Sequence, residues 1–264
     1  MFNLIKSDFY KIKKSKAFWI CTVICCLFGL TIVFATNQGV ALAKLPGADG
    51  DLKSFLDKEP FLGGAWIIGD SFSQGLHAML FAIFTAIFVS AEFQFGTMKN
   101  TVSKGAPRLN VYLSKVLVCS GACLVMLFVF MLACGISGTI LWGWDPQQSV
   151  NLGTLAGVFL DQAVLTVAYT SFFVFISMTI RSNGGAIAVN VLSVLAGSTI
   201  LNAISMLLGS PVNLSNYWIG GAISSLGTIA PASGLILKGL VIGIVYATAA
   251  FAAGSYFFKK QDIK

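Results

Sequence analysis

Residues 91–115 read AEFQFGTMKNTVSKGAPRLNVYLSK and separate two long apolar runs, about 72–91 and 116–142. This segment holds one carboxylate, Glu92, followed by four cations, although only 10% of the whole chain is charged. Each flanking run is long enough to cross the roughly 30 Å hydrocarbon core of a bilayer as a helix. The two runs therefore predict a pair of membrane-spanning helices joined by a charged loop.

The composition of the chain also indicates a membrane protein. It has 264 residues, of which 56% are hydrophobic, and a mean hydropathy of +0.85. Soluble domains carry about 25% charged residues, and one soluble core could not bury this much apolar surface. The apolar runs are too long and too uniform for barrel strands, and backbone groups in lipid must be satisfied internally, so we expect an all-α integral membrane fold.

Six apolar runs of about 20 residues occur in the chain, which is the length that a spanning helix needs. No internal repeat or linker divides the sequence, so residues 1–264 are expected to form one transmembrane domain. The six predicted spans are about 17–35, 72–91, 116–142, 156–180, 185–208 and 235–258.

The positions of the cations predict the orientation of the chain. Of the 17 lysines and arginines, thirteen flank the ends of the spans on the side that would hold both termini. Positive loops stay on the cytoplasmic side, so a multi-pass protein of the bacterial plasma membrane with both termini cytoplasmic is expected. The net charge of +7 is accounted for in this way, and no nucleic-acid partner is predicted.

The residues needed for common enzyme chemistry are missing from the sequence. There is no GxxxxGK[ST] phosphate loop, GxSxG or HExxH motif, so no catalytic residue is predicted. His77 is the only histidine, and the six cysteines lie in apolar runs without a CxxC pair, which predicts neither a metal site nor disulfides. The chain is expected to be no enzyme and to carry no cofactor.

Glu92 is the residue of the charged loop that most needs an explanation. It lies at the end of the second span, and a helix C-terminus is the unfavourable pole for an anion. We therefore expect a cation to pair with it, and Lys99, Arg108 and Lys115 are all within reach along the chain.

The rest of this loop predicts a short helix. Gly96 allows the chain to leave the second span, and Thr97 can cap a new helix, with Asn100 and Thr101 as rival caps. The KGAPR segment, which begins at Lys104, then ends the helix. The expected object is a short, rigid and basic protrusion under the membrane.

The N-terminal residues 1–16 show a two-faced pattern. Phe2, Ile5, Phe9 and Ile12 recur at helical spacing, and lysines take the opposite side. This pattern favours an amphipathic helix on the lipid of the inner leaflet, although a plain polybasic flank is the alternative.

Two segments on the outer side differ in character. Residues 36–71 are expected to form a loop. Residues 209–234 are moderately apolar, rich in Gly and Ser, and contain Pro211 and Pro231, which favours short interfacial or re-entrant helices over a plain loop.

Polar residues inside the spans are candidates for a transport path. Asp161 lies in the fourth predicted span, and Asn202 and Lys238 lie at similar estimated depth in the fifth and sixth. A carboxylate in a membrane is costly and needs a partner. We expect either a structural tie from Asp161 to Lys238 or Asn202, or a contact with cargo.

Two small-xxx-small patterns predict close helix packing. They occur at 153–157 and 239–243, and Ala247 extends the second.

These features together resemble the membrane subunit of bacterial ABC-2 type exporters, also called type V ABC transporters. The amphipathic start, the six spans, the broken outer segment and the ending FFKKQDIK extend the resemblance over the whole chain. The small size resembles permeases for bacitracin, lantibiotics and phenol-soluble modulins. The loop residues that resemble the family pattern are Glu92, Gly96, Thr97, Lys99, Arg108, Tyr112 and Lys115.

The resemblance implies a function. The loop would be a coupling helix that docks on a separate soluble ABC ATPase subunit, which binds ATP and Mg²⁺, and residues 1–16 would be the elbow helix. The resemblance also implies a second permease copy or a paralogue, and an amphipathic or antimicrobial peptide, drug or lipid as exported cargo. A non-transporting membrane sensor or assembly partner is the alternative.

Overall fold

The computed structural model describes residues 2–45, 62–103, 105–145, 152–209, 213–225 and 233–260. Every regular element in these ranges is a helix, which confirms the predicted all-α class. The helices are α1 Phe2–Lys14, α2 Lys16–Ala43, α4 Gly64–Ser73, α5 Leu76–Gln94, α6 Thr97–Ser103, α7 Arg108–Trp142, α8 Leu152–Ile180, α9 Asn183–Leu207, η2 Leu214–Tyr217, α10 Ile219–Ser225 and α11 Ser233–Lys260.

Six of these helices, α2, α5, α7, α8, α9 and α11, are long and apolar enough to cross a bilayer. They correspond to the six predicted spans. The largest differences in bounds are in α2, which ends at Ala43 instead of residue 35, and in α7, which begins at Arg108 instead of residue 116. Its first two turns, RLNVYLSK, mix polar and apolar residues, so the hydropathy pattern misses them. They continue the same helix after Pro107, which suits a helix start.

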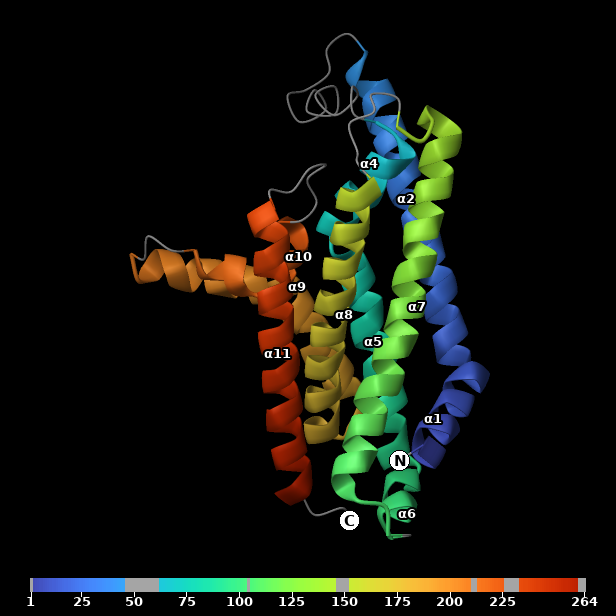
Figure 1. Ribbon diagram of the computed structural model, residues 1–264, viewed down its shortest axis with the longest axis vertical. Coiled ribbons are helices and arrows are strands. Elements are labelled where there is room, and N and C mark those ends of the chain that lie inside the picture. The colour runs from blue at the N-terminus through green and yellow to red at the C-terminus, as the bar shows by residue number, and fades with distance from the viewer. Residues whose placement is uncertain are drawn as a thin grey trace.

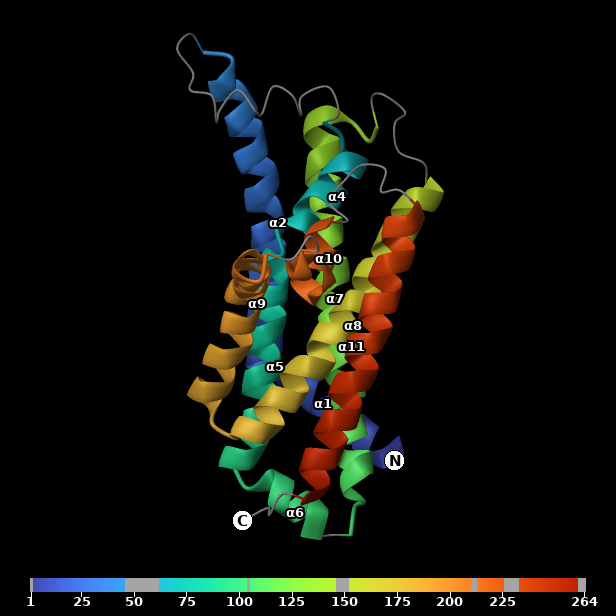
Figure 2. The ribbon, with the colours of Figure 1, turned by 90° about the vertical axis from the view of Figure 1, so that its left-hand side faces the viewer.

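The helices form an elongated bundle whose two ends differ. The short helices α1 and α6 and the last turn of α11 lie together at one end, which we call the α6 end (Figure 1). In the perpendicular view α7 and α8 run through the middle, with α9 on one side and α11 on the other (Figure 2). α1 folds against α7, and the chain turns from α1 into α2 at Ser15, whose backbone is extended (φ −71°, ψ 120°).

The helix α4 was not predicted, since residues 36–71 were expected to be a loop. It lies at the end of the bundle opposite α6 and is almost fully buried. Its first two backbone amides, of Gly64 and Ala65, donate to the carbonyls of Gly143 and Trp144 at 2.9 and 3.0 Å. The end of α7 therefore satisfies the start of α4, a long-range contact that a local sequence pattern does not contain.

The segment before the last span contains short helices, as predicted for residues 209–234. The C-terminal part of α9 leaves the bundle sideways, and η2 runs back beside it (Figure 1). The backbone amide of Leu214 donates to Ser205 Oγ at 2.8 Å, which fastens η2 to α9. α10 then packs between α8, α9 and α11, while Pro211 and Pro231 lie outside the described residues.

The most extensive helix pairing of the described residues is between α8 and α11, and two glycines allow it. A Cβ on Gly239 would collide with the carboxylate of Asp161, and one on Gly243 would lie 2.7 Å from Val164 Cγ1. Close approach of helices in a membrane depends on such small residues. The packing role predicted for 239–243 thus has a structural basis, whereas a Cβ on Gly157 would make only an ordinary contact with Ile236, at 3.5 Å.

We expect Gly243→Leu to separate α8 from α11 and to lower the free energy of unfolding by about 2 kcal/mol, the usual cost of overpacking. The matched control is Gly121→Leu in α7, where a Cβ would meet nothing within 4 Å. Thermal unfolding of the purified protein in detergent measures both. Equal melting temperatures for the two variants would contradict the packing assignment.

Candidate functional site

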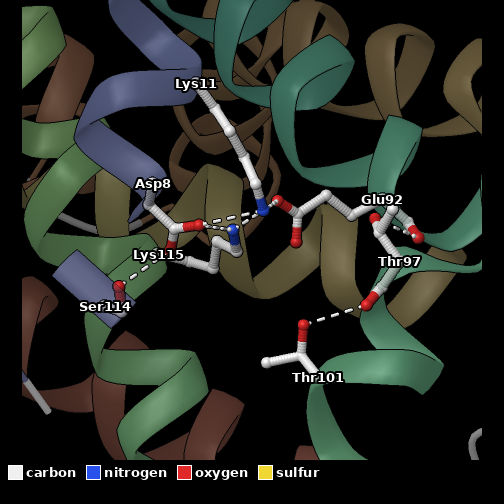
Figure 3. A network of polar contacts seen from close by, with 7 residues as sticks. All are labelled: Asp8, Lys11, Glu92, Thr97, Thr101, Ser114 and Lys115. Atoms are coloured by element: carbon white, nitrogen blue, oxygen red, sulfur yellow. Dashed lines mark hydrogen bonds and ion pairs between the residues drawn. The ribbon is translucent and has the colours of Figure 1, made fainter. Parts of the chain in front are cut away.

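Four charged side chains from three helices meet at the α6 end of the bundle. Lys115 Nζ of α7 lies 2.7 Å from Asp8 Oδ1 of α1 and 2.6 Å from Glu92 Oε1 of α5. Lys11 Nζ of α1 contacts the same two oxygens at 3.3 and 2.8 Å. Figure 3 shows the two ammonium groups between the two carboxylates. We call Asp8, Lys11, Glu92 and Lys115 the charge cluster.

The local sequence places each member of this cluster. Asp8 and Ile12 are one helical turn apart and form the buried face of α1, which packs against α7. Glu92 lies in the last turn of α5. Lys115 lies in the second turn of α7, and the hydroxyl of the preceding Ser114 donates to Asp8 Oδ2 at 2.8 Å.

The charges of the cluster balance, and most of it is shielded from solvent. The side chains of Lys115, Asp8 and Glu92 are only 2%, 7% and 9% exposed, whereas that of Lys11 is 40% exposed. Lys115 Nζ also lies over the ring of Phe88, 5.2 Å from its centroid. A buried ion pair is retained only when its partners are hydrogen-bonded, and removal of one partner is costly.

The ionisation of Lys11 is stabilised by the cluster. Burial alone would lower the pKa of Lys11, but the Glu92 and Asp8 carboxylates outweigh it and raise the pKa above the ordinary 10.5. The stabilisation that Lys11 contributes is therefore fully present below pH 10.5 and is lost only as the pH rises through the higher value of the folded state.

The short helix α6 is attached directly to this cluster. Gly96 has φ +66°, a left-handed conformation that turns the chain out of α5. The hydroxyl of Thr97 donates to the backbone carbonyl of Glu92 at 3.2 Å, and that of Thr101 donates to Thr97 O at 2.9 Å (Figure 3). Met98 is buried, whereas Lys99 is exposed. α6 thus has one face anchored and one face open.

Of the three cations expected near Glu92, Lys115 pairs with it. Arg108 instead donates from Nη1 to the carbonyls of Lys259 and Phe258, at 2.9 and 3.4 Å, and so satisfies the last turn of α11. Lys99 points away on the exposed face of α6, and Lys104 lies outside the described residues. Cations favour the C-terminal pole of a helix, which explains the position of Arg108.

Two members of the cluster were missed by the sequence analysis. Neither Asp8 nor Lys11 is among the predicted partners of Glu92, and Lys11 enters the sequence argument only as one of the cations that set the topology. A signal was present, because Asp8 is the only acidic residue before Asp49 and stands among lysines. On a lipid-facing amphipathic helix such an isolated carboxylate points to a specific partner.

The apolar residues of α1 divide between two surfaces. Ile12 is buried and Ile5 packs against the core, whereas Phe2 and Phe9 are 88% and 64% exposed. α1 therefore has one apolar strip against α7 and a second strip of phenylalanines directed outward.

The predicted ties of Asp161 are not formed in the described part of the chain. Asp161 is fully buried, but it faces Gly239 and neither carboxylate oxygen has a hydrogen-bond partner there. Lys238 lies over the ring of Tyr217 at 4.4 Å, and Asn202 is exposed. The structural tie does not form because consecutive residues of a helix point in different directions, so Gly239 and not Lys238 reaches Asp161. The alternative, a contact of Asp161 with cargo, stays a prediction.

The bundle of apolar helices, with a charge cluster at one end, defines a multi-pass membrane protein. The family model described as ABC-2 family transporter protein matches residues 4–197. This match covers well over half of the 264 residues, and the chain belongs to that family. The match includes the whole charge cluster and α6. The chain is therefore a permease subunit of an ABC transporter, and the family implies an ATPase partner subunit. A comparison with curated proteins found no match.

We expect Lys115→Met to lower the free energy of unfolding by about 3 kcal/mol or more, because it leaves two buried carboxylates with one half-exposed lysine. Adding Asp8→Asn to this variant should recover part of the loss, since one of the opposing charges is then removed. Denaturant unfolding in mixed micelles measures both variants. The control is Lys16→Met, an exposed cation at the start of α2. If Lys115→Met and Lys16→Met unfold alike, the cluster does not hold the helices together.

Proposed function

We propose that the chain is the permease subunit of an ATP-driven exporter, and that α6 is the coupling helix that docks on its ATPase. Family membership supports the permease role. The observation that carries the coupling role is the charge cluster, because it fastens α1, α5 and α7 together beside the attachment point of α6. A force on α6 would then move three helices instead of one loop.

The surface next to the cluster suits a docked protein. Lys99 is exposed on α6. Phe95, the residue before Gly96, is 79% exposed. Exposed aromatic residues such as phenylalanine are enriched at protein interfaces. The ATPase would bind ATP and Mg²⁺, and closure of two such subunits would displace α6.

A second group of contacts would carry the displacement to α8 and α9. Arg181 Cζ lies 5.7 Å from the ring centroid of Phe93, in the last turn of α5. Asn183 Nδ2, at the start of α9, donates to Gln94 Oε1 at 2.8 Å. The end of α5 is thus joined to α1 and α7 by charges, and to the turn between α8 and α9 by these two contacts.

The remaining parts of the proposal follow from the charge pattern and the family resemblance. The α6 end, with its excess of cations, would be cytoplasmic together with both termini. A second copy of the chain or a paralogous permease would complete the transport path. The cargo would be an amphipathic or antimicrobial peptide, with a drug or lipid as the nearest variant.

Isolation of the tagged chain from its native membranes tests this function. We expect a soluble P-loop ATPase to co-purify and to hydrolyse ATP in the complex. A complex that contains no ATPase would contradict the proposal and favour a sensor or assembly partner.

Within such a complex, Lys99→Glu should weaken ATPase binding by about tenfold or more, since it reverses a charge at the docking face. The matched control is Lys259→Glu, which makes the same change on the exposed side of α11 at the same end of the bundle. Equilibrium binding in nanodiscs compares the two. Equal affinities for the two variants would show that α6 is not the docking element.

A further inference from the structure

A polar cavity lies in the part of the bundle away from the charge cluster, where α4, α5, α8, α9 and α10 meet. Its volume is about 230 Å³. Figure 2 shows α10 beside α9 and below α4, at the end of α5 that is far from α6. The polar residues that line the cavity are Ser73, Gln74, Tyr169, Ser198 and Ser224.

The backbone around this cavity is irregular. α4 ends at Ser73 and α5 begins at Leu76, with Gly75 between them in the left-handed conformation (φ +64°). No side chain caps the first turn of α5. Interrupted helices at membrane depth are tolerated where they line a cavity, and transporters place binding sites at such breaks.

Tyr169 gives an independent indication of a ligand. The residue is only 1% exposed and lines the cavity, and its hydroxyl proton has no acceptor in the described residues. The indole N–H of Trp218 and the backbone amide of Gly220 lie beside the phenolic oxygen and can only donate to it, so neither takes up the hydroxyl proton. An unpaired buried hydroxyl costs free energy unless something binds to it.

An apolar pocket on another face of the bundle differs from this cavity. The hollow between α7, α8 and α11 is lined by apolar side chains and by Thr248, whose hydroxyl donates to its own helix. Lipid tails suit such a surface. Polar side chains gathered at one place in an apolar bundle are costly, and therefore indicate a function.

The residues that line the cavity offer hydrogen-bond acceptors and one hydrogen-bond donor, and none of these groups is charged. The hydroxyls of Ser73 and Ser224 donate to backbone carbonyls of Asp70 and Gly221, so their lone pairs remain as acceptors. Gln74 donates from its amide nitrogen to Asp70 Oδ2 at 3.5 Å, so its carbonyl oxygen is the acceptor. Tyr169 supplies the donor. No charged side chain lines the cavity in the described residues.

We propose that this cavity binds the amide group of an amphiphile that is dissolved in the membrane. An amide is neutral and has one donor side and one acceptor side, which matches the lining. A phosphate or carboxylate headgroup would find no cation there. The volume is below the roughly 300–1,000 Å³ of sites that enclose a whole drug-sized molecule, so the site holds one group while the apolar part stays in lipid. That this amphiphile is a peptide cargo rests on the proposed export function.

Photolabelling of the purified chain in nanodiscs tests the site without any ATPase. The probe is a dodecanamide with a diazirine next to the amide, and its comparison is the matching ester, which lacks the N–H donor. We expect the amide probe to label residues around 194–198 and 220–224. The amide concentration that gives half-maximal labelling should be about fivefold lower than the ester concentration that does so. Equal labelling by amide and ester would overturn the proposal.

Two pairs of variants make the result specific. Tyr169→Phe removes the unpaired hydroxyl and should weaken amide labelling about fivefold, whereas Tyr246→Phe, outside the cavity, should not. Ser198→Trp should fill the cavity and abolish labelling. Its control is Thr199→Trp, which places the same side chain at the exposed neighbouring position and should leave labelling intact. Unchanged labelling in both cavity variants, with melting temperatures like those of their controls, would contradict the site.

The outcomes separate this inference from the proposed function. If an ATPase co-purifies but the amide is not preferred, only the cavity assignment fails. If the amide is preferred but no ATPase co-purifies, the binding site stands and the transport role of its ligand fails.

Discussion

The burial of Lys115 constrains the whole α6 end of the bundle. Its ammonium group is removed from water, which costs several kcal/mol unless carboxylates replace the lost hydration. Asp8 and Glu92 provide that replacement, and they come from α1 and α5 while Lys115 belongs to α7. The three helices can therefore not separate without leaving a charge in an apolar environment. The cation and the two carboxylates thus fix how α1, α5 and α7 are arranged. Apolar contacts alone would not fix this arrangement, because lipid tails pack equally well against apolar side chains.

The same constraint gives α6 its mechanical role. α6 has only seven residues and is held by Met98 on its buried side and by the bond from Thr97 to the carbonyl of Glu92. Its attachment point and the charge cluster therefore share one residue, Glu92. A displacement of α6 acts on the side chain that joins α1, α5 and α7, and on the neighbouring Phe93 and Gln94, which contact the turn between α8 and α9. This arrangement is the physical basis of the coupling role that we propose.

Hydropathy was sufficient to predict the six long helices, because each depends on a local apolar run longer than the bilayer core. The charged loop also indicated that Glu92 needs a cation, but it left three candidates open, and only the structure distinguishes Lys115 from Lys99 and Arg108. The second carboxylate partner of Lys115 could not be predicted from sequence, because Asp8 contacts Lys115 only when α1 folds back against α7. The helix α4 was missed for a similar reason, since its first amides are satisfied by Gly143 and Trp144. The structural tie of Asp161, one of the two predicted alternatives, is absent because depth in the membrane fixes the height of a residue but not its direction.

The two polar regions of the bundle differ in chemistry. The charge cluster at the α6 end is saturated, since every member of it is paired. The cavity at the break between α4 and α5 is uncharged, and the proton of the Tyr169 hydroxyl there has no acceptor in the described residues. A saturated network suits rigid transmission, whereas an unsatisfied neutral site suits a ligand that binds and leaves. The two would serve the transmission of movement and the recognition of cargo, respectively.

The most direct test of the central claim is a distance measurement between α1 and α6 in the assembled transporter. Spin labels at the exposed positions 6 and 99 report this distance by pulsed electron paramagnetic resonance, with and without ATP trapped in the partner. If the charge cluster fastens the helices into one moving body, the distance between the labels stays the same and narrowly distributed in both states. A distance that changes or broadens when ATP binds, while the protein remains folded, would contradict the account.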